Sequence, residues 1–237
     1  MKKLTTILLA LLMLLALGCS AMAETTGVTL PDGRALRLEA QLVGRQINGG
    51  ACEEEEIYRL DVYEGQADQP KQTLYFTREN GEMMIQAVDL DFDGYLDLDI
   101  LYGAGATNSR HTFFRWDPAQ DRFTHESGIY TWLSSYTLYP EKKLISNFLH
   151  NSAAEGVTQL FRWERDAEGQ PRLTLIREAE VAADPEEPDT LNLIIREPSR
   201  EWGELMETAR YSYSFDQAVE NAAIYEKEEQ LLWEGLE

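Results

Sequence analysis

DLDFDGYLDLD, residues 89–99, carries five aspartates in eleven positions, and apolar residues alternate with them. Carboxylates at this spacing repel one another, by about 1 kcal/mol or more per pair at ~4–6 Å even when solvated. The centre of the stretch is Phe-Asp-Gly-Tyr, which is typical of a tight turn between two strands. The sequence therefore indicates that a cation holds this turn together.

The spacing of the oxygen ligands predicts calcium. Numbered from Asp89, carboxylates fall at positions 1, 3, 5 and 9 and a glycine falls at position 6. A calcium loop turns sharply at position 6, and Gly94 allows this because it has no Cβ to clash. Ca²⁺ takes about six to eight oxygen ligands, whereas Mg²⁺ prefers fewer protein ligands in near-octahedral order. The expected ligands are the carboxylates of four residues and one backbone carbonyl: Asp89, Asp91, Asp93, Asp97 and Tyr95.

The loop differs from an EF-hand, because position 12 is Ile100 instead of a bidentate glutamate. Its flanks alternate between apolar and polar residues, which predicts strand–loop–strand rather than helix–loop–helix. An acidic turn with no ion is the alternative, because the chain has 42 acidic residues.

The rest of the chain predicts a mainly β fold. Alternating apolar residues recur, for example at 36–42, 58–62 and 191–195, and turn residues separate these runs. We expect antiparallel sheets forming a sandwich, barrel or propeller, in a single domain over residues 24–237 with the calcium loop at 89–97. Asn80-Gly81 predicts a hairpin that joins 73–78 to 82–88.

The C-terminal part is ambiguous in sequence. A helix beginning at Glu201, with Ser199 as its cap, fits residues 201–208, and Tyr211, Tyr213 and Phe215 alternate as in a strand. Residues 220–233 contain good helix formers without a clean apolar stripe. We expect a final hairpin there, with a short helix as the alternative.

The N-terminus is typical of an exported protein. Two lysines precede an apolar run at 5–17, and Ala21-Met22-Ala23 fits a signal-peptidase site, so residues 1–23 are the expected signal peptide. The alternative is a lipoprotein anchored through Cys19. Loss of the two lysines takes the net charge from −21 to −23. This charge argues against nucleic-acid binding and favours cations and basic proteins as partners.

The motif Asp91-Phe92-Asp93-Gly94-Tyr95 resembles the calcium loops of FG-GAP repeats, although only one copy is present. It is also similar to a family of bacterial exported β proteins with an Asn-Phe-Asp-Gly-Tyr loop. That family is related to periplasmic lysozyme inhibitors and to immunity proteins against peptidoglycan hydrolases. The resemblance covers about residues 57–163 and includes the segment FFRWDPAQDRF. The chain departs from the family pattern at its first position, where Asp91 stands in place of asparagine. It implies a calcium site and a compact β fold whose loops plug a hydrolase cleft.

No enzyme motif stands out. Ser134 and Ser135 lack a nucleophile elbow, and Cys52 follows no catalytic pattern. The expected function is therefore a secreted, non-enzymatic calcium-binding module for an extracellular or periplasmic protein such as a basic hydrolase. The alternative function is glycan or cell-surface binding, and the third candidate function is hydrolysis. The glycine-rich stretch after the calcium loop supplies candidate partner-binding residues: Asn108, Ser109, Arg110 and His111.

Overall fold

The computed structural model describes residues 24–48, 53–79, 83–104, 108–126, 128, 130, 133–152, 154–165, 167, 171–199, 203–219 and 223–236. The expected signal peptide, Cys19 and Cys52 lie outside these residues. Contacts divide the chain into two compact units, Met1–Glu79 and Asn80–Glu237. The expectation of one domain stays a prediction.

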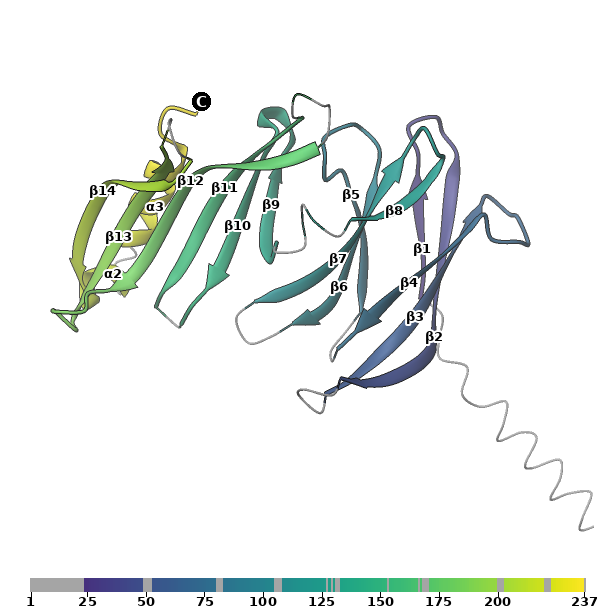
Figure 1. Ribbon diagram of the computed structural model, residues 1–237, viewed down its shortest axis with the longest axis horizontal. Coiled ribbons are helices and arrows are strands. Elements are labelled where there is room, and N and C mark those ends of the chain that lie inside the picture. The colour runs from purple at the N-terminus through teal and green to yellow at the C-terminus, as the bar shows by residue number, and fades with distance from the viewer. Residues whose placement is uncertain are drawn as a thin grey trace, which may run out of the picture. The chain divides into compact units, whose positions relative to one another are not determined.

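The prediction of a mainly β protein is confirmed, because 63% of the structure is strand and 9% is helix. The strands form three antiparallel sheets, and the structure is not a closed barrel (Figure 1). Among the described residues, no helix is both long enough and apolar enough to cross a membrane.

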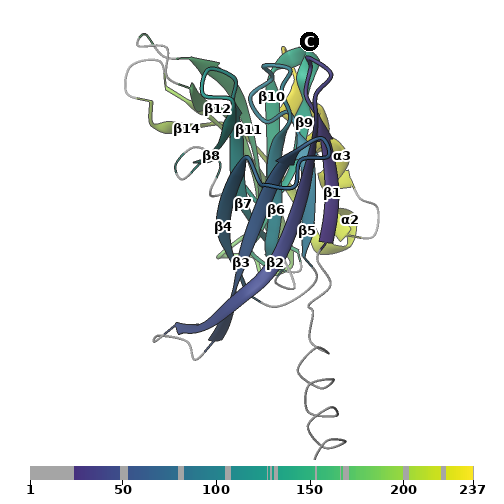
Figure 2. The same ribbon diagram turned by 90° about the vertical axis from the view of Figure 1, so that its right-hand side faces the viewer.

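The first unit is one four-stranded sheet. It consists, in spatial order, of β1 (Glu24–Thr29), β2 (Ala35–Asn48), β3 (Glu53–Glu64) and β4 (Gln72–Arg78). The alternation seen in sequence buries every second side chain, including Leu36, Leu38 and Leu60. Strands β2 and β3 form a long hairpin (Figure 2) that carries the glutamates at 53–56 near its tip.

The second unit begins with another four-stranded sheet: β5 (Met84–Val88), β6 (Asp97–Ala104), β7 (Ser109–Asp117) and β8 (Arg122–Glu126). The turn predicted at Asn80-Gly81 lies outside the described residues, and β4 and β5 belong to two different sheets.

A six-stranded sheet completes the second unit. In chain order it contains β9 (Ser135–Tyr139), the 3-10 helix η1 (Pro140–Lys142), β10 (Leu144–His150), β11 (Gly156–Arg165), β12 (Pro171–Ala183), β13 (Thr190–Pro198) and β14 (Leu205–Ser214). Each strand pairs with the next, so the sheet is a meander. The expected helix at 201–208 is wrong, because residues 205–208 belong to β14.

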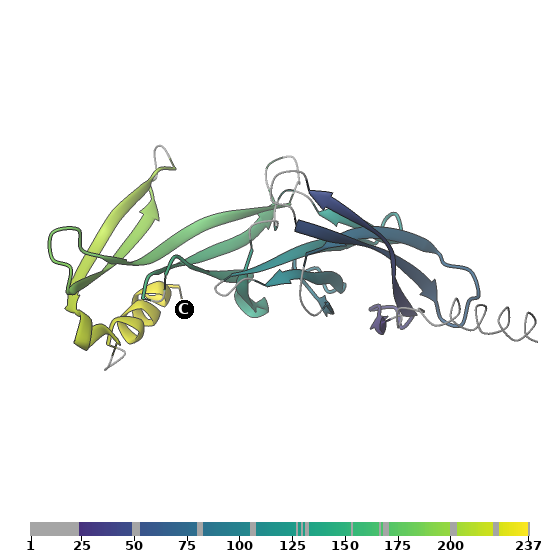
Figure 3. The same ribbon diagram turned by 90° about the horizontal axis from the view of Figure 1, so that it is seen from below.

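Two helices, α2 (Phe215–Val219) and α3 (Ala223–Trp233), end the described chain, so the expected final hairpin is wrong. Ile224, Leu231 and Leu232 are buried, at the i, i+7 and i+8 spacing that places them on one helical face. They pack with Leu193 and other residues of the six-stranded sheet. The helices therefore cover one face of this sheet (Figure 3).

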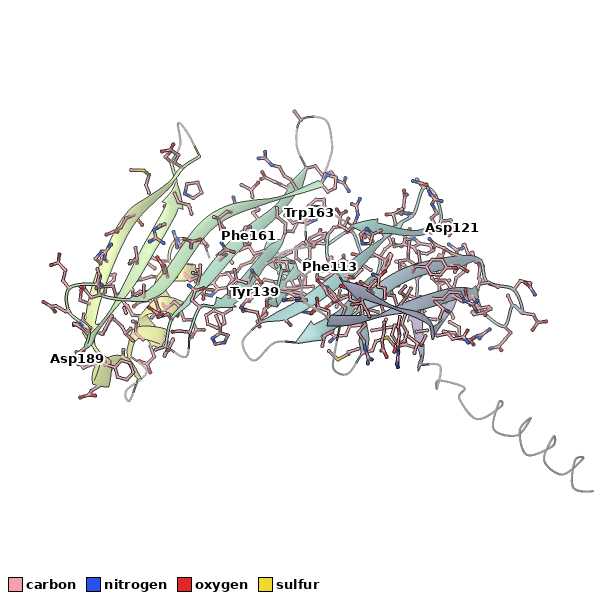
Figure 4. All side chains as sticks on the ribbon, turned by 60° about the horizontal axis from the view of Figure 1, so that its bottom comes forward. Phe113, Asp121, Tyr139, Phe161, Trp163 and Asp189 are labelled. Carbon is pink, nitrogen blue, oxygen red and sulfur yellow. The ribbon has the colours of Figure 1, made fainter. Side chains whose placement is uncertain are left out.

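A second buried cluster joins the two sheets of this unit. It contains Leu90, Phe113, Tyr130, Leu133, Ile145 and Trp163. Figure 4 labels Phe113 on β7 and Trp163 on β11, which come from different sheets. The Trp163 indole donates a 2.7 Å hydrogen bond to the Tyr130 hydroxyl, and that hydroxyl donates to the Leu90 carbonyl at 3.4 Å. Leu90 belongs to the aspartate-rich loop, so this core supports the loop directly.

Replacing Tyr130 with phenylalanine is expected to lower the free energy of unfolding by about 1–3 kcal/mol, because the buried Trp163 N–H loses its acceptor. Urea denaturation measures the change. Tyr225→Phe is the control, since Tyr225 is 42% exposed and water replaces its partners. Equal stability of the Tyr130→Phe protein and the wild type would contradict a structural role for this hydroxyl.

Candidate metal centre

The aspartate-rich loop connects β5 to β6, which are antiparallel neighbours that close at the pair Val88 and Asp97. The predicted strand–loop–strand arrangement is therefore confirmed. Two apolar residues of the loop belong to the core: Leu90 is fully buried, and Phe92 packs against the same cluster. The odd positions carry the aspartates. Alternation in the sequence thus separates an apolar side of the loop from a carboxylate side.

The Asp89 carboxylate organises the turn. Its two oxygens accept hydrogen bonds from the backbone N–H groups of Asp93 and Gly94, at 3.1 and 3.0 Å. Gly94 has a φ of +90°, a conformation that residues with a Cβ rarely adopt. Phe92 also has a positive φ of 55°. Two left-handed residues in one short loop bend the chain back on itself and bring the aspartates together.

Asp97 is the most buried carboxylate of the loop, at 1% exposure. Its Oδ2 accepts from the Leu90 N–H at 2.9 Å, and its Oδ1 accepts from the Trp116 N–H at 2.8 Å. One side chain therefore ties the start of the loop to the end of β7. Burial raises the pKa of the Asp97 carboxyl to about 8, against the lowering effect of these backbone donors, and the Asp91 charge adds to the rise.

Asp91 is buried at 2% exposure and only half satisfied. Its Oδ2 accepts a 3.1 Å hydrogen bond from the Arg115 guanidinium. Its Oδ1 is buried and has no hydrogen-bond partner among the described residues. A buried anionic oxygen without a partner is costly, so an oxygen in this position calls for a cation or a donor.

Three of the predicted ligands converge. Asp89, Asp91 and Asp97 each offer a carboxylate oxygen, and these atoms all lie within 4.8 Å of one another. Two oxygens bound to one Ca²⁺ at 2.3–2.6 Å lie at most about 5 Å apart, so the separations fit one ion. The set is chemically suited to a hard cation, because all its ligand atoms are carboxylate oxygens.

Asp93, a fourth predicted ligand, is not one of the three residues that converge, and the place of the Tyr95 carbonyl stays a prediction. Asp93 is exposed, and its Oδ1 accepts from the Tyr95 N–H at 2.8 Å. Partial burial and then the charges of Asp91 and Asp89 raise the pKa of Asp93 to about 6. Asp93 is therefore near enough to feel both charges. Burial likewise raises the pKa of Asp89.

The charge balance of the site is negative. When ionised, its four aspartates carry four negative charges, and Arg115 is the cation that pairs with them through Asp91. Three negative charges remain. A divalent cation would offset two of these, which is the electrostatic reason that the arrangement suits one.

A second polar network lies beside the site. Asp99 accepts from the His111 ring Nδ1 at 2.6 Å and from the Tyr136 hydroxyl at 2.6 Å, and the His111 Nε2 is 2.8 Å from the Ser109 hydroxyl oxygen. A carboxylate can only accept, so the proton lies on Nδ1 and a neutral ring accepts at Nε2. Burial, followed by the Asp99 charge, raises the pKa of Tyr136.

The predicted partner-binding residues mostly make contacts inside the chain. Asn108 and the backbone of His150 exchange two hydrogen bonds, and the Ser109 N–H donates to the Ser134 hydroxyl. His111 is in the Asp99 network, and Arg110, which also has an interaction partner, is exposed to solvent. A role of these residues in partner binding stays a prediction, in which Arg110 is the accessible charge.

Several functional contacts were missed in sequence. Arg115 and the Trp116 N–H lie on β7, some 20 residues beyond the loop, and only strand pairing brings them to Asp91 and Asp97. Ser109 and His111 could be placed on one face of a strand by their spacing of two. Their proximity to Asp99 could not, because the β6–β7 register shifts between Leu101 and Gly103.

Comparison with known proteins adds no family assignment. No protein-family model matches the chain, and no curated protein matches it. The resemblance to exported calcium-loop proteins therefore stays a prediction, and the case for function comes from the geometry of the site.

Proposed function

We propose that this protein is an exported, calcium-stabilised β module that binds another extracellular protein and has no enzymatic activity. Two observations on buried Asp91 carry the calcium site: its Oδ1 has no hydrogen-bond partner among the described residues, and its carboxylate offers an oxygen within 4.8 Å of oxygens from Asp89 and Asp97. Asp93 and the Tyr95 carbonyl complete the proposed coordination, as the loop pattern predicts.

Calcium acts on stability in this proposal. Asp97 already links the loop to β7, and Leu90 links it to the core between the two sheets. Neutralising the carboxylates removes the repulsion that opposes this arrangement. Binding to the folded chain alone then raises the free energy of unfolding with calcium concentration.

Thermal unfolding in EGTA and in 10 mM CaCl₂ tests the site. For a dissociation constant on the order of 10⁻⁴ M, as in extracellular modules, 10 mM calcium adds about 2.7 kcal/mol. At about 2–4 °C per kcal/mol, the expected rise in Tm is roughly 5–10 °C. The response should disappear in Asp91→Ala, which removes the orphaned oxygen, and should shrink in Asp93→Ala.

Asp216→Asn is the matched control, because Asp216 is an exposed aspartate on α2 outside the ligand set. Its calcium response should equal that of the wild type. Circular dichroism in EGTA verifies that each variant folds without metal. A wild-type Tm that is the same in EGTA and in calcium would refute the proposed site.

The proposed partner is a basic extracellular protein, with a cell-wall hydrolase as the first candidate. A net charge of −23 after signal-peptide removal supports this, because a strongly negative surface field accelerates encounter with cationic proteins.

Lysis of bacterial cells by lysozyme, followed by turbidity, tests this partner class. Residues 24–237 in excess over lysozyme should slow lysis at 50 mM salt and less so at 300 mM, because salt screens the attraction. Acidic serum albumin at equal concentration is the control for non-specific charge effects. Unchanged lysis at low salt excludes this hydrolase as the partner.

The second candidate function is hydrolysis of an ester, and the Ser109–His111–Asp99 chain of hydrogen bonds favours it. The connectivity matches a nucleophile, a general base and a carboxylate that orients the base. In this candidate, the Ser109 oxygen attacks an acyl carbon while His111 takes its proton. His111 then returns the proton to the leaving alcohol, and water releases the acyl group.

A fluorophosphonate probe distinguishes this candidate from a structural network. Activated Ser109 should form a covalent adduct, detected by intact-protein mass spectrometry, and Ser109→Ala should abolish it. Ser135→Ala should leave the adduct in place, because Ser135 is an exposed serine outside the network. Absence of any adduct after prolonged incubation removes the candidate and leaves the hydrogen bonds with a structural role.

A further inference from the structure

A separate cavity of about 290 Å³ lies between α3 and the six-stranded sheet. Phe148 and His150 on β10 and Val181 on β12 contribute to its sheet side, and Tyr225 and Glu228 contribute from α3. It shares no lining residue with the aspartate-rich loop. Phe148 and His150 pack edge to face, with ring centroids 4.4 Å apart, so part of the wall is aromatic.

Glu228 is a buried acid in this mainly apolar setting. The residue is 9% exposed, and its Oε1 accepts a hydrogen bond from the Thr158 hydroxyl. It forms no ion pair with a described residue. Burial raises the pKa of its carboxyl, as expected for an acid without an opposite charge nearby. A buried carboxylate is ordinarily paired with a cation, because its desolvation is costly.

The acidic side chains that line the cavity favour a positively charged ligand. Glu155 is a second acid on the cavity wall, and the described lining contains no lysine or arginine. Anionic ligands would meet two carboxylates. A bare metal ion would find one buried carboxylate and apolar walls, far from the several oxygens it needs. An ammonium group attached to an apolar body fits both the acid and the aromatic surface.

We propose that this cavity, which we call the Glu228 cavity, binds a small organic amine whose protonated nitrogen pairs with the Glu228 carboxylate. The apolar part of the ligand lies against Phe148 and Val181. Tyr225, which lines the cavity and is 42% exposed, offers its ring to the cation. None of the described residues that line the cavity belongs to the calcium loop.

Isothermal titration with benzylamine at pH 8 tests the proposal, and benzyl alcohol is the uncharged ligand of equal size. Benzylamine should bind with a Kd on the order of 1 mM or tighter, which is ordinary for a ligand of this size. Benzyl alcohol should bind about tenfold more weakly or worse, since it cannot form a charge-assisted hydrogen bond. Equal affinity of the two ligands would overturn the proposal.

Two variants locate the binding. Glu228→Gln keeps the size of the side chain and should weaken benzylamine about tenfold or more, with little effect on benzyl alcohol. Glu229→Gln, an exposed neighbour on α3, should change neither ligand. Tyr225→Leu should weaken benzylamine several-fold while leaving the fold intact. Unchanged benzylamine binding in Glu228→Gln would overturn the assignment, whatever the affinity.

A further titration distinguishes the two possible sources of the ammonium group, a free small molecule and the lysine side chain of a protein. Nα-acetyl-lysine methylamide carries the ammonium group of a protein side chain. It should bind more weakly than benzylamine, because its flexible chain fills the cavity less well and loses more conformational freedom. Tighter binding of the lysine derivative would contradict a small-molecule ligand.

Discussion

The second unit depends on the position of one buried carboxylate, that of Asp97. It accepts backbone hydrogen bonds from the loop that precedes it and from β7, so it fixes the corner where β5, β6 and β7 meet. An anion at this depth is favourable only if its charge is compensated, and two backbone donors supply part of that compensation. Asp91 and Asp89 bring further negative charge to the same point. The fold therefore gathers negative charge at a point that could hold a metal ion.

The loop couples this charged corner to the apolar core. Its alternation places aspartates on one side and Leu90 and Phe92 on the other, among residues of both sheets of the unit. Leu90 is the chain neighbour of Asp89 and Asp91 and packs in the same cluster as Tyr130 and Trp163. A shift of the aspartates therefore affects the packing of this cluster. In the proposed function, this connection is the route by which a bound ion would stabilise strands that it does not touch. The first unit has its own sheet, in which alternate residues are buried.

The sequence predicted those features that depend on local patterns. Period-two alternation predicted the strands, and the glycine at position 6 of the loop predicted the turn. Both signals depend only on residues that are close together in the sequence. Partners that depend on strand pairing were missed: Arg115 reaches Asp91 only through the β6–β7 ladder. Residues 220–233 lacked a clean stripe because α3 places Glu228 on its buried face. The same acid that obscured the helix in sequence gives the cavity its chemistry.

Calcium titration calorimetry on residues 24–237 tests the central claim most directly. The account predicts one equivalent of calcium per chain, bound with an affinity on the order of 10⁻⁴–10⁻³ M, and weaker binding of magnesium, which prefers fewer protein ligands. Absence of heat with calcium up to about 10 mM, an order of magnitude above that range, would contradict it. The aspartates of residues 89–97 would then form a turn held by Arg115 and backbone donors alone.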